Sequence, residues 1–513
     1  MTEKMNVSAE SGWVTRRINL LICVVLVIAV IGYILVAVYA PYDAYGDVFE
    51  YFTFTNTVID DQSLDNISQI TGVTLGDSKP VYQYTPLLFV QTAALQRLTG
   101  ASIPLIYVII NIIKLLTLAA LVFTLVKKMF NSSWPAFWSM VFVLFGPLIP
   151  YYSHLLTRNF TWLFLLAYLL IFQSRRIGSS LRLVLLIMIL FALMLYHHET
   201  GLLFSSLLIV FSSFEWLIQY RQKIISKVRV TVNIFLTVAT PITVILFSRG
   251  YLASLIHARG LIQVKAEVLK ANEFISQNIG WVPIIIIAFG LISWFWIKIH
   301  RAELSRFLIW FLLLSLLGFP LSGSWVSMRL IEQFQLLAMI LGGGAVVWLM
   351  LMVRKKVIQN LVSGLILIMA LALFGQTIDD RIKNSQVSWD YLSNLEEIKP
   401  LLQNQKVLSD PFTLFRIQGL TGAVPAYQFR RPKDDYSQIK ELASVFKEEN
   451  PELAKKYLID NEIEYVVINS EFTPVWGGSE LMKFDDPINY QLLVEFPAVG
   501  NELLSVYQVN NNP

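Results

Sequence analysis

Residues 16–50 read RRINLLICVVLVIAVIGYILVAVYAPYDAYGDVFE. Two arginines precede about 22 apolar residues, and a loop containing three carboxylates follows at once. An apolar run of about 20 residues spans a bilayer as a helix, and Lys or Arg marks its cytoplasmic end. No small-residue cleavage site closes the run, so we interpret it as a retained first helix with its N-terminus inside.

The composition of the whole chain is typical of a membrane protein. Of its 513 residues, 55% are hydrophobic and 15% are charged, and the mean hydropathy is +0.59. Soluble proteins carry about 25% charged residues. The net charge of +4 is small and its basic residues are scattered, which excludes a nucleic-acid-binding protein. The single cysteine, Cys23, permits no disulfide within the chain.

Short basic clusters recur along the chain, and the sequence between successive clusters has room for two helices. The positive-inside rule places these clusters on the cytoplasmic side. We therefore predict an α-helical polytopic bundle of about 11 spanning helices. The predicted spans are 18–39, 102–126, 135–150, 159–173, 183–197, 200–219, 230–249, 281–297, 307–320, 330–353 and 357–375.

From about residue 376 the hydropathy falls and the pattern changes. KVLSD, EYVVIN and LLSVYQV predict strands, whereas VSWDYLSNLEEIKPLL and the Lys/Glu-rich run 437–458 predict helices. We predict two domains. Residues 1–375 form the transmembrane domain, including the acidic outer loop 40–101, and residues 376–513 form a small extracytoplasmic α/β domain.

Three carboxylates lie close together after the first helix. Asp43, Asp47 and Glu50 have i, i+4, i+7 spacing, which places them on one face if the segment is helical. Like charges this close raise a pKa or recruit a cation. A solvated acidic loop is the alternative interpretation. Further along the loop, residues 80–100 (PVYQYTPLLFVQTAALQRLTG) predict an amphipathic interfacial helix of about 13 residues, too short to span.

These motifs resemble the GT-C superfamily of membrane glycosyltransferases, which use polyprenyl-phosphate sugars. The resemblance covers roughly residues 14–375 and suggests a mannosyltransferase-like or aminoarabinose-transferase-like architecture. It rests on the order of four segments: GDVFEYF after the first helix, YQYTPLL in the first outer loop, LYHHETGLLF at a helix turn, and WVSMRLIEQFQLLAMILGGG at the start of a late helix.

The resemblance implies inverting transfer of a sugar to a glycan, lipid or protein acceptor on the extracytoplasmic face. Such a reaction needs a carboxylate to remove the acceptor proton and donors to stabilise the departing phosphate. Asp47 is the candidate base, with Glu50 or Asp43 as second carboxylate. Many GT-C enzymes have an adjacent acidic pair here, so the identity of the base stays open among these three residues. If a metal is used, Asp47 and Glu50 are the candidate ligands for Mg²⁺ or Mn²⁺.

Candidates for binding the donor phosphate and the substrates come from the outer segments. They are Tyr84, His154, Arg158, His197, His198, Glu199, Arg259 and Arg329. Structural alternatives exist, such as an Arg329–Glu332 pair or an Arg158 side chain that snorkels to headgroups. Adjacent histidines point about 100° apart on a helix, which argues against joint chelation. Lys114 falls in mid-span, where charged residues usually face a cavity or a partner.

Two other functions remain open. A lipid-linked-sugar flippase or transporter usually has inverted repeats, and the sequence contains no repeat. A polysaccharide polymerase or ligase concentrates its key residues in a late outer loop, whereas the carboxylates here lie in the first. The chain lacks a P-loop and a D-x-D motif. We predict a multi-pass protein of a prokaryotic plasma membrane, in contact with membrane lipids.

Overall fold

The computed structural model describes residues 12–39, 41–42, 48–61, 74–75, 79–80, 87–145, 157–174, 176–247, 325–353, 355–384, 387–426, 444–470, 473–474, 481–497 and 502–510. The chain divides into two compact units. The first comprises Met1–Tyr33 and Ile109–Asp379, and the second comprises Ile34–Val108 and Asp380–Pro513. Each unit has its own set of buried apolar side chains.

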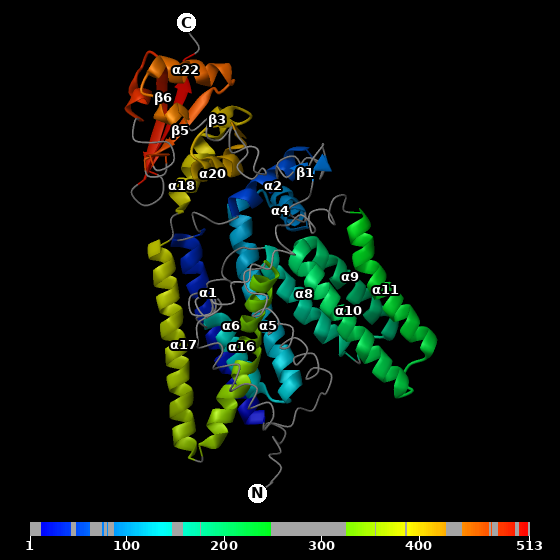
Figure 1. Ribbon diagram of the computed structural model, residues 1–513. Coiled ribbons are helices and arrows are strands. Elements are labelled where there is room, and N and C mark those ends of the chain that lie inside the picture. The colour runs from blue at the N-terminus through cyan, green and yellow to red at the C-terminus, as the bar shows by residue number, and fades with distance from the viewer. Residues whose placement is uncertain are drawn as a thin grey trace. The chain divides into compact units, whose positions relative to one another are not determined.

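The first unit is a helical bundle (Figure 1). It contains the whole of α6 (Ser133–Phe145), α8 (Thr157–Phe172), α9 (Ser179–Tyr196), α10 (His198–Arg221), α11 (Lys227–Phe247) and α16 (Trp325–Met352). It also contains most of α1 (Gly12–Tyr39), α5 (Ile103–Phe130) and α17 (Lys356–Asn384), each of which has one end in the second unit. Within the described residues, six helices are long and apolar enough to cross a membrane, and three shorter apolar helices accompany them. The chain is therefore a multi-pass membrane protein, as predicted. The number of eleven spans stays a prediction, because 281–297 and 307–320 lie outside the described residues.

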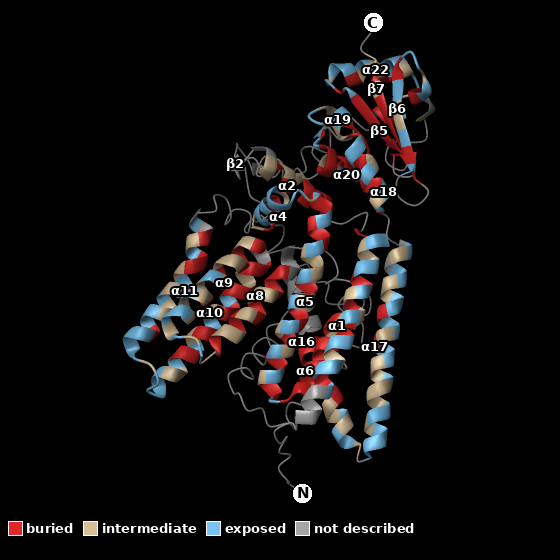
Figure 2. Ribbon diagram, turned by 180° about the vertical axis from the view of Figure 1, so that it is seen from behind, coloured by how far each residue is buried: buried red, intermediate tan, exposed pale blue. Residues whose placement is uncertain are grey.

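Helix α17 differs most from its predicted span. It continues to Asn384, beyond the predicted end at residue 375, because Ile378 still packs against the core of the bundle. Most of α17 is exposed or half-buried (Figure 2), and only 11% of its most apolar 18-residue stretch is buried. Such an apolar and exposed surface is the kind that faces lipid in a membrane protein.

The crossing of α16 and α6 shows why small residues are needed in the late helix. A Cβ built on Gly343 would overlap the carbonyl oxygen of Pro135, and Ser139 donates a hydrogen bond to the carbonyl oxygen of Ile340 over 3.0 Å. Small residues allow helices to approach closely in a bilayer, where apolar burial alone does not drive association. Gly343 therefore permits the close approach of α16 and α6.

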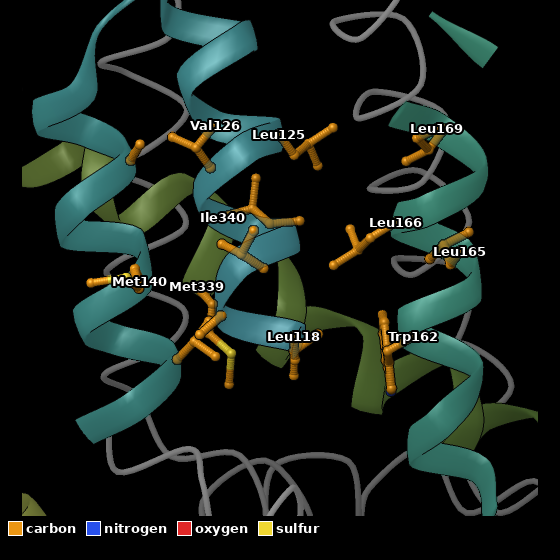
Figure 3. Close-up of a cluster of buried hydrophobic side chains, with 14 of the residues drawn as sticks. Leu118, Leu125, Val126, Met140, Trp162, Leu165, Leu166, Leu169, Met339 and Ile340 are labelled. Atoms are coloured by element: carbon orange, nitrogen blue, oxygen red, sulfur yellow. The ribbon is translucent and has the colours of Figure 1, made fainter. Parts of the chain in front are cut away.

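The core of the bundle is built from long apolar side chains. Figure 3 shows Leu166 of α8 pointing toward α5, which carries Leu118 and Leu125, with Met140 of α6 and Ile340 of α16 on the other side. All five side chains are at most 2% exposed. Removing one such side chain from a core costs about 2–5 kcal/mol. These side chains belong to one buried apolar cluster of the first unit.

The second unit contains helices α2 (Val48–Asp61) and α4 (Leu87–Thr99) and the short antiparallel strands β1 (Thr74–Leu75) and β2 (Lys79–Pro80). Its C-terminal part contains α18 (Trp389–Glu397), α19 (Lys399–Leu402), β3 (Lys406–Leu408), α20 (Pro411–Thr421), β4 (Val424–Pro425), α22 (Pro451–Asp460), β5 (Tyr465–Asn469), the 3₁₀ helix η4 (Leu481–Asp485), β6 (Tyr490–Pro497) and β7 (Leu503–Val509). The predicted 13-residue helix in the first outer loop is confirmed as α4.

The C-terminal sheet has the strand order β4-β3-β5-β7-β6. β4, β3 and β5 are parallel, β7 pairs antiparallel with β5, and β6 pairs antiparallel with β7. The predicted strands at KVLSD, EYVVIN and LLSVYQV are confirmed as β3, β5 and β7. β5 is buried along its whole length, as its apolar run predicts. The mostly helical fold with a small C-terminal sheet is therefore as predicted.

By its contacts, the first outer loop groups with the C-terminal segment in one compact unit, and the domain boundary at residue 375 stays a prediction. Three contacts join the two segments. Tyr42 forms a β-bridge with Val387, and the indole nitrogen of Trp389 donates to the carbonyl oxygen of Ala37 over 2.8 Å. Helix α2 packs along α20.

Candidate active site

The predicted site residues fall into three groups, according to whether the structure describes the residue, only its backbone, or also its side chain. Asp43, Asp47, Tyr84, His154 and Arg259 lie outside the described residues. Five others lie on described helices, but their side chains are outside the described set: Glu50 on α2, Arg158 on α8, His198 and Glu199 on α10, and Arg329 on α16. His197 is described together with its side chain.

Helix α2, which carries Glu50 in its first turn, is held by an aromatic core. Phe49 and Phe52 are fully buried, with ring centroids 5.5 Å apart. On the same helix, the Thr55 hydroxyl lies 2.7 Å from the Tyr107 hydroxyl of α5. Rigid elements position side chains more precisely than loops do. The backbone around Glu50 therefore has a defined place in the second unit.

Residue Tyr42 anchors the other end of the acidic segment. Its ring packs edge-on against Phe52 with centroids 5.3 Å apart, and its hydroxyl donates a hydrogen bond to the carbonyl oxygen of Pro104. Burial raises the pKa of Tyr42 well above its ordinary value. The hydroxyl consequently stays protonated and keeps its role as a donor. Tyr42 and Val48, the described residues on either side of 43–47, are both buried.

Helix α20 crosses α2 at a glycine. The side-chain amide of Asn56 donates to the carbonyl oxygen of Gly419 over 3.0 Å. A Cβ built on Gly419 would overlap the carbonyl oxygen of Phe49 and lie 3.1 Å from its carbonyl carbon. Only a residue without a side chain permits this approach. The C-terminal segment thus holds the first turn of α2 through direct backbone contact.

A buried polar network fixes the start of α20. Asp410 caps the helix by accepting a hydrogen bond from the backbone nitrogen of Thr413 at 2.9 Å, and it accepts another from the Thr473 hydroxyl at 3.0 Å. Burial raises the pKa of Asp410, and this effect is larger than the opposite effect of the hydrogen bonds. Further along α20, Arg416 forms an ion pair with Glu502 at 3.4 Å, with both side chains at most 2% exposed.

The sequence prediction missed this network, although part of the signal was present. A Ser-Asp-Pro sequence directly after a strand is typical of a helix start, with Asp at the N-cap and Pro in the first turn. Arg416 gives no such signal, because a single arginine in an apolar stretch does not reveal its partner 86 residues away.

His197 caps the N-terminus of α10. Its imidazole Nδ1 accepts a hydrogen bond from the backbone nitrogen of Thr200 over 3.2 Å and so caps α10. The turn is as tight as predicted, because α9 ends at Tyr196 and a Cβ on Gly201 would lie 2.8 Å from the carbonyl carbon of Leu193. Accepting at Nδ1 leaves Nε2 to carry the proton.

Lys114 confirms the expectation that a mid-span charge faces a partner. It is 2% exposed, and its ammonium lies 5.4 Å from the centre of the Phe160 ring. Phe160 stacks on Tyr196 with centroids 5.1 Å apart. A cation over an aromatic face is stabilised by about 0.5–2 kcal/mol. The structure therefore brings Lys114 close to the start of α8, which carries Arg158, and to the turn at His197.

The described residues contain no group of three or more His, Cys, Asp or Glu side chains placed to hold a metal. The side chains of Asp47 and Glu50 are not among those described, so the magnesium or manganese site stays a prediction.

No protein-family model and no curated protein sequence matches the chain. Solved structures do match. ArnT from Cupriavidus metallidurans is 10% identical in its apo state, with a TM-score of 0.59 over 97% of this chain and 98% of ArnT. The same protein bound to undecaprenyl phosphate gives a TM-score of 0.57 over the same shares.

Two other enzymes share the architecture. The archaeal oligosaccharyltransferase AglB from Archaeoglobus fulgidus, in complex with an inhibitory peptide and a dolichol-phosphate, is 11% identical, with a TM-score of 0.51 over 93% of this chain and 74% of AglB. The arabinofuranosyltransferase AftD from Mycobacteria is 13% identical, with a TM-score of 0.56 over 95% of this chain and 40% of AftD. The chain therefore shares the fold of these three enzymes, which agrees with the architecture that the sequence resemblance implies.

Proposed function

We propose that the chain is a membrane glycosyltransferase that uses a polyprenyl-phosphate-linked sugar as donor and acts on the extracytoplasmic face of a prokaryotic plasma membrane. The observation that supports this most strongly is the extent of the match to ArnT, which covers 97% of this chain and 98% of that enzyme. Both the bundle and the C-terminal domain thus have counterparts. ArnT was solved with undecaprenyl phosphate and AglB with a dolichol-phosphate, and both are polyprenyl-phosphate lipids.

In the proposed reaction, an acceptor hydroxyl on a glycan, lipid or protein attacks the anomeric carbon of the sugar. The bond between that carbon and the phosphate oxygen breaks, and the lipid phosphate departs with the electron pair. Asp47 takes the acceptor proton as general base, with Glu50 or Asp43 as its neighbour. Attack from the face opposite the phosphate inverts the configuration.

The departing phosphate gains negative charge, which needs donors or cations fixed in advance. We assign this role, or binding of the substrates, to residues of the outer helix ends and loops: Tyr84, His154, Arg158, His197, His198, Arg259 and Arg329 could face the phosphate, whereas Glu199, a carboxylate, is suited only to substrate binding. The cluster of Lys114, Phe160 and Tyr196 supports the assignment for two of them. It places a buried cation near the helix start that carries Arg158 and near His197.

The test is release of free lipid phosphate from a radiolabelled polyprenyl-phosphate sugar by the purified protein, with sugar transfer followed in parallel. We expect release by the wild type and none by Asp47→Asn at an unchanged protein level. Asp65→Asn, in the same outer loop, is the matched control and should retain activity. A chelator arm shows whether a metal is used.

Several outcomes would contradict the proposal. Translocation of the donor in vesicles without phosphate release would indicate a flippase. Transfer of a whole lipid-linked glycan, with single sugars left untouched, would indicate a polymerase or ligase. An Asp47→Asn variant with normal turnover would remove Asp47 from the role of base, even if the protein is a transferase.

A further inference from the structure

A cavity lies in the first unit where α9 begins, α10 ends and α11 begins. It is partly open, and the empty space in it and immediately outside it amounts to about 320 Å³. Its polar and aromatic lining comes from all three helices: Ser179, Arg182, Trp216, Gln219, Arg229 and Asn233. The remaining lining residues are apolar. The proposed transferase chemistry makes no use of this region.

The cavity carries positive charge. Arg182 and Arg229 line it, and its lining includes no acidic residue. The Arg182 guanidinium donates to the carbonyl oxygen of Ser174 over 3.1 Å, which fixes its position. Arg229 is exposed, and its side chain makes no hydrogen bond or ion pair with the described part of the chain. Glu215, the acid next to Trp216, is 1% exposed and does not line the cavity.

Two helix starts and one helix end, that of α10, lie at the cavity, so the helix ends together add a partial positive charge. Ser179 is the first residue of α9, whose N-cap, Gly178, supplies no side-chain hydrogen bond. Helix α11 begins at Lys227, two residues before Arg229. The first turn of a helix presents backbone N–H groups and a partial positive charge, which together favour an anion. With two guanidinium groups in the same cavity, the chemistry fits a phosphate.

The surroundings indicate what carries that phosphate. On α11, Val228, Val232 and Phe235 are 73%, 45% and 69% exposed, next to the face that presents Arg229 and Asn233. An exposed apolar stripe on a spanning helix contacts acyl chains. A phospholipid would occupy both the cavity and the apolar stripe of α11, with its headgroup in the cavity and its acyl chains along the stripe. A soluble phosphate would use the cavity alone.

We propose that this cavity binds the headgroup phosphate of an anionic membrane phospholipid. The basic clusters beside the cavity place it at the cytoplasmic leaflet by the positive-inside rule. Basic pockets between spanning helices on that side are suited to anionic lipid headgroups. The site is separate from the donor site proposed above, because that site lies on the opposite face of the membrane.

The test is native mass spectrometry of the delipidated full-length protein, titrated with phosphatidylglycerol, with phosphatidylcholine and with glycerol phosphate. We expect tighter binding of phosphatidylglycerol than of the other two. Arg229→Gln should weaken it about fivefold, the factor for one basic residue near a membrane surface. Arg229→Lys should retain most of the affinity. Arg221→Gln is the matched control, because Arg221 is exposed at the end of α10 and does not line the cavity.

Three results would overturn the proposal. Equal binding of phosphatidylcholine would show that charge is not recognised. Equal binding of glycerol phosphate would assign the cavity to a soluble ligand. Unchanged phosphatidylglycerol binding by Arg229→Gln would place the lipid elsewhere. Since Arg229 is exposed, the glutamine variant should fold, which size-exclusion chromatography verifies.

Discussion

Replacement of Gly419 by alanine tests whether the C-terminal segment positions the first turn of α2. In the structure, a Cβ at this position would lie 3.1 Å from the carbonyl carbon of Phe49 and closer still to its oxygen. Carbon atoms pack favourably at about 3.5–4.0 Å. The two helices must therefore separate by at least about 0.4–0.9 Å to admit the methyl group.

This displacement affects stability and catalysis differently. Overpacking a tight contact costs about 1–3 kcal/mol of unfolding free energy. Moving a catalytic group by about 1 Å slows a reaction by about a hundredfold. Since α2 carries Glu50 and begins directly after Asp47, we expect kcat to fall by about tenfold to a hundredfold. The KM for the donor should change little, because the candidate phosphate-binding residues are mostly on other helices.

The assay is sugar transfer by the solubilised protein, with the melting temperature of each variant measured in parallel. Gly364→Ala is the matched control, because a Cβ there would meet nothing within 4 Å. A folded Gly419→Ala protein with the kcat of the wild type would refute the positioning role. A wild-type protein without transferase activity would instead refute the proposed function, so the two failures are distinguishable.

Three predictions concern other residues. Arg416→Met should lower the unfolding free energy by about 3–5 kcal/mol, because it leaves the buried Glu502 carboxylate unpaired; an unchanged melting temperature would contradict this. Because burial raises the pKa of Asp410, the folded chain binds the carboxyl proton more tightly than the unfolded chain does. Protonation of Asp410 therefore adds to the unfolding free energy below the ordinary pKa of 3.8, and this contribution is lost as pH rises through the raised pKa. Asp410→Asn should remove this pH dependence from the melting temperature, and parallel pH profiles of the two proteins would contradict the prediction. His197→Ala should cost about 1 kcal/mol through the lost cap, whereas His197→Asn should retain it; reduced transfer by a fully stable asparagine variant would assign the imidazole a direct role, and normal transfer would leave capping as its function.

Length and composition were sufficient to predict the membrane helices. Apolar runs with basic ends predicted α1, α5, α9, α10, α11 and α17, because the bilayer imposes a minimum length on any helix that crosses it. The ends were less predictable. Helix α17 continues beyond residue 375 into a polar segment in which Ile378 packs against the core, and composition alone does not reveal this contact.

In the C-terminal sheet, β3, β5 and β7 were predictable from their patterns, whereas the two-residue strand β4 and the irregular strand β6 were not. β5 is a continuous apolar run and β7 is mostly buried. β6 contains a register shift between Leu492 and Val494, which interrupts the alternation expected of a half-buried strand. An edge strand with a bulge therefore gives a weak signal in sequence.

The roles of the candidate site residues stay predictions, and the packing that supports helix α2 could not be predicted from the sequence. The sequence places acidic residues directly before and within α2. It does not reveal that α2 packs on α20, since Asn56 and Gly419 are 363 residues apart. A glycine within a helix usually lowers helix propensity, and only its neighbour in space explains its presence here.

The second unit is assembled from segments made at very different times. About 270 residues separate Val108 from Asp380, so at 5–20 residues per second the ribosome needs roughly 15 to 55 seconds to supply the second half. During that interval Phe49 of α2 lacks the α20 backbone that later covers it. Biogenesis of this protein therefore includes a waiting period in which the nascent outer loop is open to proteases and chaperones, and it ends only when α20 has been synthesised.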